Sequence, residues 1–222
     1  ALPIYDCAVV MHSWFMSAST FAYGMFSFVQ LREVFGYASA VGYVPFDSIT
    51  LTAEIKKTII ANLDAKCPVM IALTNTGKLG HQALIDGYGY HGGKLYFHLN
   101  LGWCNVKGEN CWYGLDDFHV EDSKGNRFDL VDGLVYNIFP DFSGDVLSGR
   151  VLDEEGKPVA NAVVQASLSG KVVDSVETGA NGIYAFVLSG GTTYKVSCEG
   201  RSISVALPSA SSAKCMKTSK EE

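Results

Sequence analysis

The sequence lacks the signals that mark several common classes of protein. No stretch approaches the ~18 uninterrupted apolar residues of a membrane-spanning helix, so a membrane span is excluded. The 17 Lys and Arg residues are outnumbered by 23 Asp and Glu residues, which leaves no basic surplus to neutralise nucleic-acid phosphates. No Cys-x-x-Cys pair, phosphate-binding glycine loop or Gly-x-Ser-x-Gly elbow occurs. The sequence therefore offers no support for a nucleic-acid partner, a zinc ribbon, a nucleotide loop or a serine-hydrolase elbow.

Charged residues are scarce, whereas apolar residues are plentiful. Hydrophobic residues make up 48% of the 222 residues and charged residues 18%, with a mean hydropathy of +0.14. This composition provides a real core and is not that of a disordered chain. At ~150 residues per domain, the length predicts one or two domains. The chain starts at Ala1 with neither Met nor a basic leader, so we expect a processed or trimmed product with a segment missing upstream.

The six cysteines are too few for a disulfide scaffold. Cys104 and Cys111 could close a small loop, and Cys198 and Cys215 could tie down the C-terminal tail. Either bridge would imply an oxidising compartment. Isolated buried thiols are an equally open alternative.

Residues 1–142 contain every His and Trp and nearly all aromatic residues. Apolar residues at helical spacing predict a helix over Phe21–Phe35, ended by Gly36, and a second helix that starts near Thr50 or Thr52. Strands are predicted after Pro68, over Val69–Leu73, His81–Tyr88, Leu95–Leu99, Trp112–Leu115 and Leu134–Phe139. Helices followed by an antiparallel sheet indicate an α+β fold for this domain.

Residues 143–208 show a different sequence pattern, in which short Val-rich runs are separated by turn signals such as Asn181-Gly182. Such regularly spaced strands predict a small all-β sandwich. Its strands are expected over Val146–Val151, Ala162–Leu168, Lys171–Glu177, Tyr184–Leu188, Tyr194–Cys198 and Ile203–Leu207. The Ser/Lys/Glu-rich tail, residues 209–222, is expected to be flexible.

One hairpin holds the residues that could carry chemistry. His81 opens an apolar strand directly after Gly80, and Asn100 ends the next strand with Trp103 just beyond. A short antiparallel hairpin would make His81 and Asn100 neighbours. A His oriented by an Asn amide and shielded by an indole is the base half of a cysteine-nucleophile site. The alternatives are a core histidine for His81, His98 as a structural partner, and Asp86 as a lower-ranked orienting group.

At these residues a family resemblance emerges. The segments GHQALIDGYG, YFHLNLGW and ENCWYGL resemble the streptopain family of bacterial cysteine peptidases, and more distantly the papain-like pattern. The resemblance covers roughly residues 1–140 and implies a papain-like portion. It assigns His81 as general base and acid, Asn100 as its orienting residue, and Trp103 with Gly80 as shield and substrate groove.

The sequence departs from this pattern at several positions. Gln82, Leu101 and Cys104 stand where the family commonly has Ala, Trp and Gly. The family's nucleophilic Cys lies well before the segment that matches Ile4–Met11, and no position of this chain corresponds to it. Cys7 falls where the resemblance predicts a buried strand or turn, Cys67 precedes a core strand, and Cys104 lacks the helix N-terminus that would lower a thiol pKa. We therefore expect the nucleophile to lie upstream of this chain.

A second resemblance covers the predicted sandwich. The run from Ser148 to Val164, with Thr178 to Tyr184, is similar to carboxypeptidase regulatory-like domains, a prealbumin-like or immunoglobulin-like sandwich. Such modules act as spacers, surface-presenting domains or weak binding domains. No catalytic cluster is visible among its residues.

Taken with the residues, the resemblances predict a secreted or cell-surface bacterial cysteine endopeptidase with no metal and no other cofactor. Its substrate would be a polypeptide, and these 222 residues alone would be inactive. The missing upstream segment or a second copy of the chain would cover exposed apolar surface. The alternative is a catalytically inactive, peptidase-like binding or adhesion protein in which the sandwich carries the function.

Overall fold

The computed structural model describes residues 2–17, 20–44, 50–77, 79–103, 110–116 and 119–208. The chain forms two compact units. The first contains residues 1–53 and 68–142, and the second contains residues 54–67 and those after 142. None of the described helices is long and apolar enough to cross a membrane.

The N-terminal elements differ from the sequence-based expectation. Residues Leu2–Val10 form helix α1, where the resemblance predicted a buried strand or turn, and Cys7 on this helix is exposed. Pro3 lies in the first turn, where the missing proline N–H costs no helical hydrogen bond. The strand or turn was therefore a wrong prediction.

The helix predicted over Phe21–Phe35 is shorter in the structure. Strands β1 (Trp14–Phe15) and β2 (Thr20–Phe21) form a small hairpin, and the 3-10 turn η1 (Gly24–Phe26) leads into α2 (Ser27–Glu33). Gly36 follows with a φ of +72°, the left-handed conformation that glycine adopts most easily after a helix.

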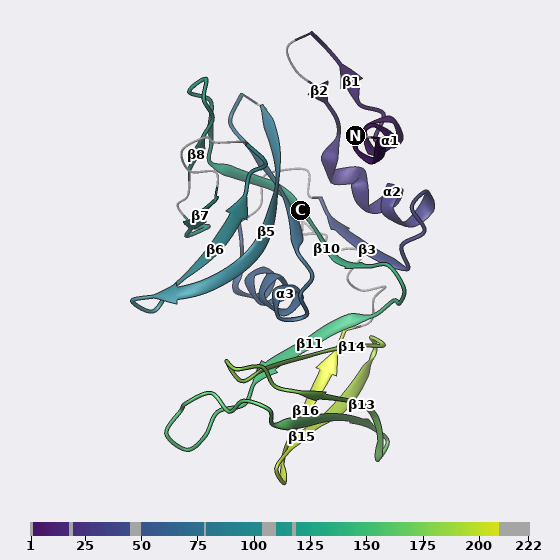
Figure 1. The fold of residues 1–222 in the computed structure, drawn as a ribbon, viewed down its shortest axis with the longest axis vertical. Coiled ribbons are helices and arrows are strands. Elements are labelled where there is room, and N and C mark those ends of the chain that lie inside the picture. The colour runs from purple at the N-terminus through teal and green to yellow at the C-terminus, as the bar shows by residue number, and fades with distance from the viewer. Residues whose placement is uncertain are drawn as a thin grey trace, which may run out of the picture. The chain divides into compact units, whose positions relative to one another are not determined.

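The first unit is built on a six-stranded antiparallel sheet in the order β3-β10-β4-β5-β6-β7 (Figure 1). All five strands predicted for this region are present, which confirms the mixed α+β architecture. The strands are β3 (Ser39–Tyr43), β4 (Val69–Thr74), β5 (Gly80–His91), β6 (Lys94–Asn100), β7 (Asn110–Tyr113) and β10 (Leu130–Phe139). Strand β3 and the short hairpin of β8 (Val120–Glu121) and β9 (Arg127–Phe128) were not predicted from the sequence.

Helix α2 packs on this sheet through Phe28 and Leu31, which contact the buried residues Ala40, Ala72 and Val135. The central strands are apolar on their inner positions, and Ile71, Leu73, Ile85, Leu99 and Phe97 are all nearly completely buried. Burial of such side chains contributes about 1.5–3 kcal/mol each, so this sheet is the rigid base from which the site residues project.

Helix α3 (Ala53–Asp64) begins close to the predicted position, with Glu54 in its first turn. It ends in a Schellman motif: the Lys66 N–H donates to Leu63 O, the Cys67 N–H donates to Asn62 O, and Lys66 has a φ of +61°. Pro68 follows directly. In the second unit, the Ser148 hydroxyl donates to Asp64 Oδ2 at 2.7 Å, which ties this helix to the C-terminal strands.

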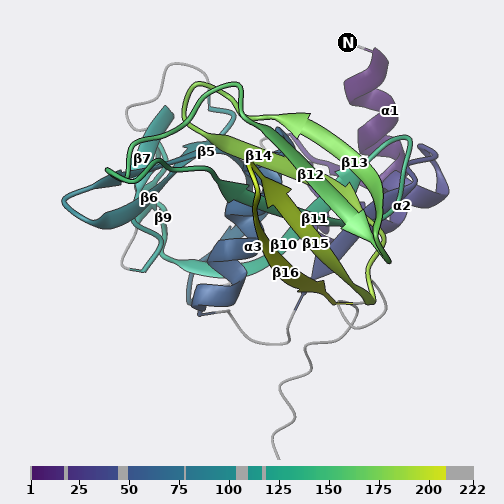
Figure 2. The same ribbon diagram turned by 90° about the horizontal axis from the view of Figure 1, so that it is seen from below.

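The second unit contains the six predicted strands, and they form two antiparallel sheets consistent with a sandwich (Figure 2). One sheet pairs β11 (Asp145–Arg150) with β14 (Ile183–Leu188). The other runs in the order β13-β12-β15-β16, with β12 (Val163–Leu168), β13 (Lys171–Glu177), β15 (Thr192–Cys198) and β16 (Arg201–Leu207). Their inner faces share one core that includes Leu147, Val164, Ala166, Phe186 and Val196.

Candidate active site

His81 lies near the start of β5, where its Cα pairs with Leu73 of β4. The ring nitrogen Nε2 is 2.7 Å from the backbone oxygen of Leu101. Because a carbonyl oxygen can only accept, Nε2 must carry the proton of the neutral ring. The other nitrogen, Nδ1, then has its lone pair available as a base.

The turn that follows β6 brings this carbonyl to His81. The Asn100 side-chain oxygen accepts a hydrogen bond from the Gly102 N–H at 3.0 Å, and Gly102 has a φ of +69°. Leu101, between them, is 2% exposed, so its carbonyl is firmly held. Asn100 itself pairs with Leu84 in the sheet, three residues beyond His81. The Leu101 carbonyl, rather than the Asn100 amide, is thus the hydrogen-bond partner of the ring.

Trp103 lies against His81, as the sequence predicts. The two ring centroids are 4.5 Å apart with an interplanar angle of 39°. Gly80, the other predicted groove residue, is exposed, and a Cβ there would meet only Leu73 O at 3.8 Å. Neither the backbone conformation nor the space around it therefore requires a glycine at this position.

Two further residues of this site are not predicted from the sequence, and both belong to the β8–β9 hairpin. Phe128 is buried, with its ring 5.8 Å from that of His81 and 6.2 Å from that of Trp103. Asp122 follows β8 and accepts hydrogen bonds from the N–H groups of Lys124 and Asn126 and from the Asn126 amide. The Asp-Ser-Lys-Gly-Asn sequence signals a turn, but nothing in it shows that this turn lies beside His81.

Opposing influences act on the pKa of His81. Burial lowers the pKa of His81 below its ordinary value, whereas the Leu101 hydrogen bond and the negative charge of Asp122 act to raise that pKa. The Asn126 side chain and backbone hold the pKa of Asp122 below its ordinary value, so this carboxylate is charged near neutrality. A neutral imidazole with a nearby fixed carboxylate is suited to accept a proton.

The second His of the motif forms a separate cluster. His98 Nδ1 lies 2.5 Å from Asp86 Oδ1, and the His98 ring is 5.3 Å from that of Trp112. A β-bulge makes Asp86 the extra residue between the pairs Ile85–Leu99 and Gly87–His98. Asp86 is thus the hydrogen-bond partner of His98. The sequence also placed Asp86 below Asn100 as an orienting residue for His81.

None of the described cysteines hydrogen-bonds His81. Cys7, Cys67, Cys111 and Cys198 are free thiols. Burial raises the pKa of Cys67, and burial with the nearby Glu199 raises the pKa of Cys198, so both thiols are poor thiolates. Cys104 and Cys215, the partners considered for Cys111 and Cys198, lie outside the described residues. No group of three or more His, Cys, Asp or Glu side chains is placed to hold a metal within the described residues.

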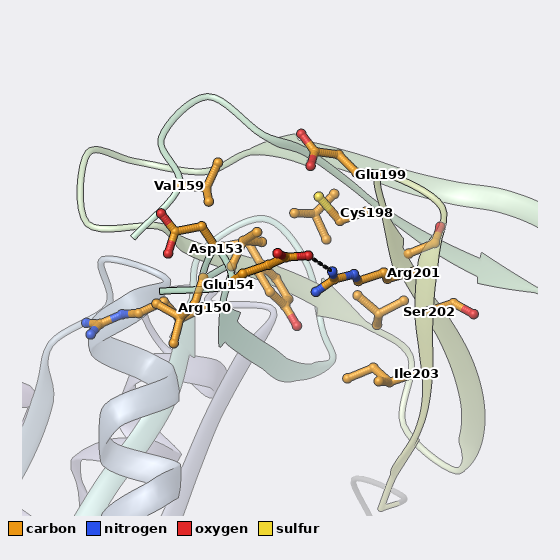
Figure 3. A pocket seen from close by; sticks show the side chains of 15 residues that line it. Arg150, Asp153, Glu154, Val159, Cys198, Glu199, Arg201, Ser202 and Ile203 are labelled. Atoms are coloured by element: carbon orange, nitrogen blue, oxygen red, sulfur yellow. Dashed lines mark hydrogen bonds and ion pairs between the residues drawn. The ribbon is translucent and has the colours of Figure 1, made fainter. Parts of the chain in front are cut away.

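A pocket of about 490 Å³ lies in the second unit (Figure 3). Its floor is apolar, with Val164 and Val196, and its rim carries both signs of charge, including Arg150, Asp153 and Glu199. Glu154 and Arg201 reach toward each other from opposite sides and form an exposed ion pair of 3.4 Å. An apolar floor with a few charged groups at the rim is the usual composition of a ligand-binding pocket.

Comparison with known families agrees with this geometry. Residues 1–113, half of the chain, match the Peptidase C10 family. Residues 146–207 match the carboxypeptidase regulatory-like domain. No curated protein and no solved structure shows significant similarity to the chain. The chain belongs to the Peptidase C10 family, the cysteine peptidases of the streptopain type, and a carboxypeptidase regulatory-like domain follows its peptidase region. Membership in this family implies a polypeptide substrate.

Proposed function

We propose that this chain supplies the base half of a cysteine endopeptidase and that His81 is its general base and acid. The hydrogen bond from Nε2 to the Leu101 carbonyl carries the proposal, because it fixes the tautomer in which Nδ1 can take a proton. Trp103 and Phe128 cover the ring and keep water from this bond. Asn100 contributes by stabilising the turn that holds the Leu101 carbonyl, because its side-chain oxygen accepts a hydrogen bond from the Gly102 N–H.

The reaction needs a cysteine that faces Nδ1, and we place this thiol in a polypeptide segment outside residues 1–222. His81 takes the thiol proton, and the thiolate attacks the carbonyl carbon of the peptide bond. The imidazolium then gives its proton to the departing amine, which leaves an acyl-enzyme. Water, deprotonated by His81, hydrolyses the thioester and restores the thiol. The secreted or cell-surface location expected from the resemblance remains a prediction.

The test is covalent labelling of the native gene product with an epoxide inhibitor of thiol proteases, followed by peptide mapping. We expect one labelled cysteine outside these 222 residues, with labelling and casein hydrolysis lost in His81→Ala. The variant His91→Ala, at an exposed histidine of the same strand, should keep both. Labelling of one of the six cysteines of this chain, or labelling that survives His81→Ala, would contradict the mechanism.

A second function is favoured by the mixed-charge pocket of the sandwich unit. In this alternative, the peptidase-like unit is an inactive scaffold, and the protein binds or adheres through its C-terminal domain. Absence of both labelling and casein hydrolysis in the native gene product would favour it. These 222 residues alone are expected to be inactive, and turnover that is lost on mutation of Cys7 or Cys104 would overturn that expectation.

A further inference from the structure

The N-terminal part of the first unit leaves many large side chains in solvent. Seven of them, between 41% and 65% exposed, define what we call the aromatic surface: Tyr5, Trp14, Phe15, Met16, Phe21, Tyr23 and Phe26. They come from α1, the β1–β2 hairpin and η1, and α1 and the hairpin lie together at one end of the unit, away from β6 and β7 (Figure 1). Isolated exposed aromatics are common, but a group of this size is not.

The members of this surface contact one another. Tyr5 stacks on Phe15 with ring centroids 6.2 Å apart. On the other side of the hairpin, rings follow one another from Trp14 to Phe21 (5.9 Å), from Phe21 to Tyr23 (5.1 Å) and from Tyr23 to Phe26 (6.4 Å). Trp14, Phe21, Tyr23 and Phe26 also line a hollow of about 250 Å³. The surface is therefore continuous and shaped, not a scatter of separate side chains.

Its area matches that of a stable protein interface. A large aromatic side chain presents about 150–250 Å², so seven half-exposed side chains leave on the order of 700 Å² of apolar area. The largest apolar patch on a typical monomer is about 300–600 Å², whereas each partner in a standard interface buries about 800 Å². The surface thus exceeds what a solitary chain commonly exposes.

The hairpin at its centre also needs support. Strands β1 and β2 pair only with each other among the described strands, so each keeps an unpaired outer edge. Such an isolated two-stranded ribbon is at best marginally stable in water. Contact with another apolar surface would stabilise both its faces and its edges.

The lack of charged residues in this part of the chain favours a second copy as the partner of the aromatic surface. The 25 residues between Asp6 and Arg32 include no Asp, Glu, Lys or Arg, although the whole chain carries a formal net charge of −6. Two negatively charged copies repel each other over most of their surfaces, but not here. An uncharged aromatic surface offers no electrostatic complement to a charged partner, and two copies of it can meet without like-charge repulsion.

We propose that the aromatic surface is the contact between two copies of this chain, paired about a twofold axis. The contact leaves the candidate active site uncovered. The aromatic surface approaches the sheet at Gly24, where a Cβ would lie 2.5 Å from the Gln82 side-chain oxygen. Gln82 and His81 are consecutive in β5 and point to opposite faces of the sheet. The proposal therefore does not depend on the proposed peptidase function.

The test is analytical ultracentrifugation of the 222-residue chain over a wide range of concentration. We expect a monomer–dimer equilibrium in which Tyr23→Ser weakens association by about tenfold or more, as for a central aromatic of an interface. The matched control is Tyr90→Ser, because Tyr90 is 62% exposed against 65% for Tyr23, yet lies at the far end of β5. It should leave the equilibrium unchanged.

A second variant distinguishes loss of association from loss of folding. Ser17→Asp adds one charge at an exposed position of the hairpin and removes no packed side chain. It should also weaken the dimer while the far-ultraviolet circular dichroism stays that of the unmodified chain. A monomer at every concentration would overturn the proposal and leave the surface to a different polypeptide. A dimer that Tyr23→Ser and Tyr90→Ser weaken equally would overturn it as well.

Discussion

In the base role proposed for His81, three neighbours of different kinds act on the ring. The Leu101 carbonyl sets which nitrogen carries the proton, and the rings of Trp103 and Phe128 limit contact with water. Burial is the strongest influence on its pKa and keeps the ring neutral near pH 7. Asp122 works against burial, because a negative charge favours the imidazolium.

The charge of Asp122 can be tested directly on this ring. In Asp122→Asn, the attraction that raises the pKa of His81 is lost, so that pKa should fall further below 6.5. The shift should be small and should shrink in high salt, because solvent screens an exposed carboxylate. The measurement is a titration of the His81 ring protons by nuclear magnetic resonance.

The chain offers a control with the same local geometry. Asp153 in the second unit accepts hydrogen bonds from the N–H groups of Glu155 and Lys157, the spacing that Asp122 uses with Lys124 and Asn126. Asp153→Asn should therefore disturb a comparable turn and leave the His81 titration unchanged. Equal titration curves for both variants and the unmodified chain would remove Asp122 from the site.

At the scale of single elements, helix α2 depends on a glycine in the strand beneath it. A Cβ on Gly42 of β3 would lie 2.8 Å from Phe28 Cγ, with two further ring atoms closer still. Gly42→Ala should therefore push α2 away from the sheet and lower the free energy of unfolding by about 1–3 kcal/mol. Urea denaturation followed by circular dichroism measures this change.

The comparison variant is Gly89→Ala, also inside a strand of the same sheet. A Cβ there would meet the exposed Trp112 ring at 3.5 Å, an ordinary contact. Its unfolding midpoint should stay close to that of the unmodified chain. If the two variants lost equal stability, steric contact with Phe28 would not be what fixes a glycine at position 42.

The strands were predictable from sequence because their side chains alternate or form short apolar runs between turn residues. The hairpin of β5 and β6 is an example, since Gly92 and Gly93 take the positive φ values that its turn needs. Its exact register was not predictable, because the bulge at Asp86 leaves no distinct mark in the sequence. That bulge pairs Asn100 with Leu84 instead of Ile85 and makes Asp86 the extra residue, whose carboxylate contacts His98.

The site was predictable in its side chains but not in its backbone partner. His81 and Trp103 were identified because an imidazole and an indole have recognisable chemistry. The Leu101 carbonyl could not be found in this way, since every residue has one. Phe128 and Asp122 lie more than forty residues from His81 along the chain, so only the folded structure brings them beside it.

At the scale of the whole molecule, the second unit contains a buried threonine whose hydroxyl links two backbone segments by hydrogen bonds. Thr178 is 2% exposed; its hydroxyl donates to Val159 O at 2.7 Å and accepts from the Ala162 N–H at 2.9 Å. Thr178→Val keeps the shape but leaves the buried Ala162 N–H without this acceptor. The free energy of unfolding of the second unit should fall by about 1–3 kcal/mol.

Hydrogen exchange of the sandwich strands would report this loss, with Thr193→Val as the control. Thr193 is exposed on β15, and a Val there suits a strand, so exchange should stay unchanged. Protection in Thr178→Val equal to that of the control would show that the buried hydroxyl contributes little.

The second unit includes two separate stretches of the chain, which matters if its C-terminal part is transplanted. A gene fragment that encodes only residues 146–207, the stretch matched by the domain family, would carry Ser148 without its acceptor Asp64 and without helix α3. Grafted onto another protein, that fragment would expose whatever surface α3 occupies within this unit. Helix α3 lies within residues 1–113, the stretch matched by the Peptidase C10 family, so a hydrogen bond of the sandwich strands depends on a residue of the peptidase region.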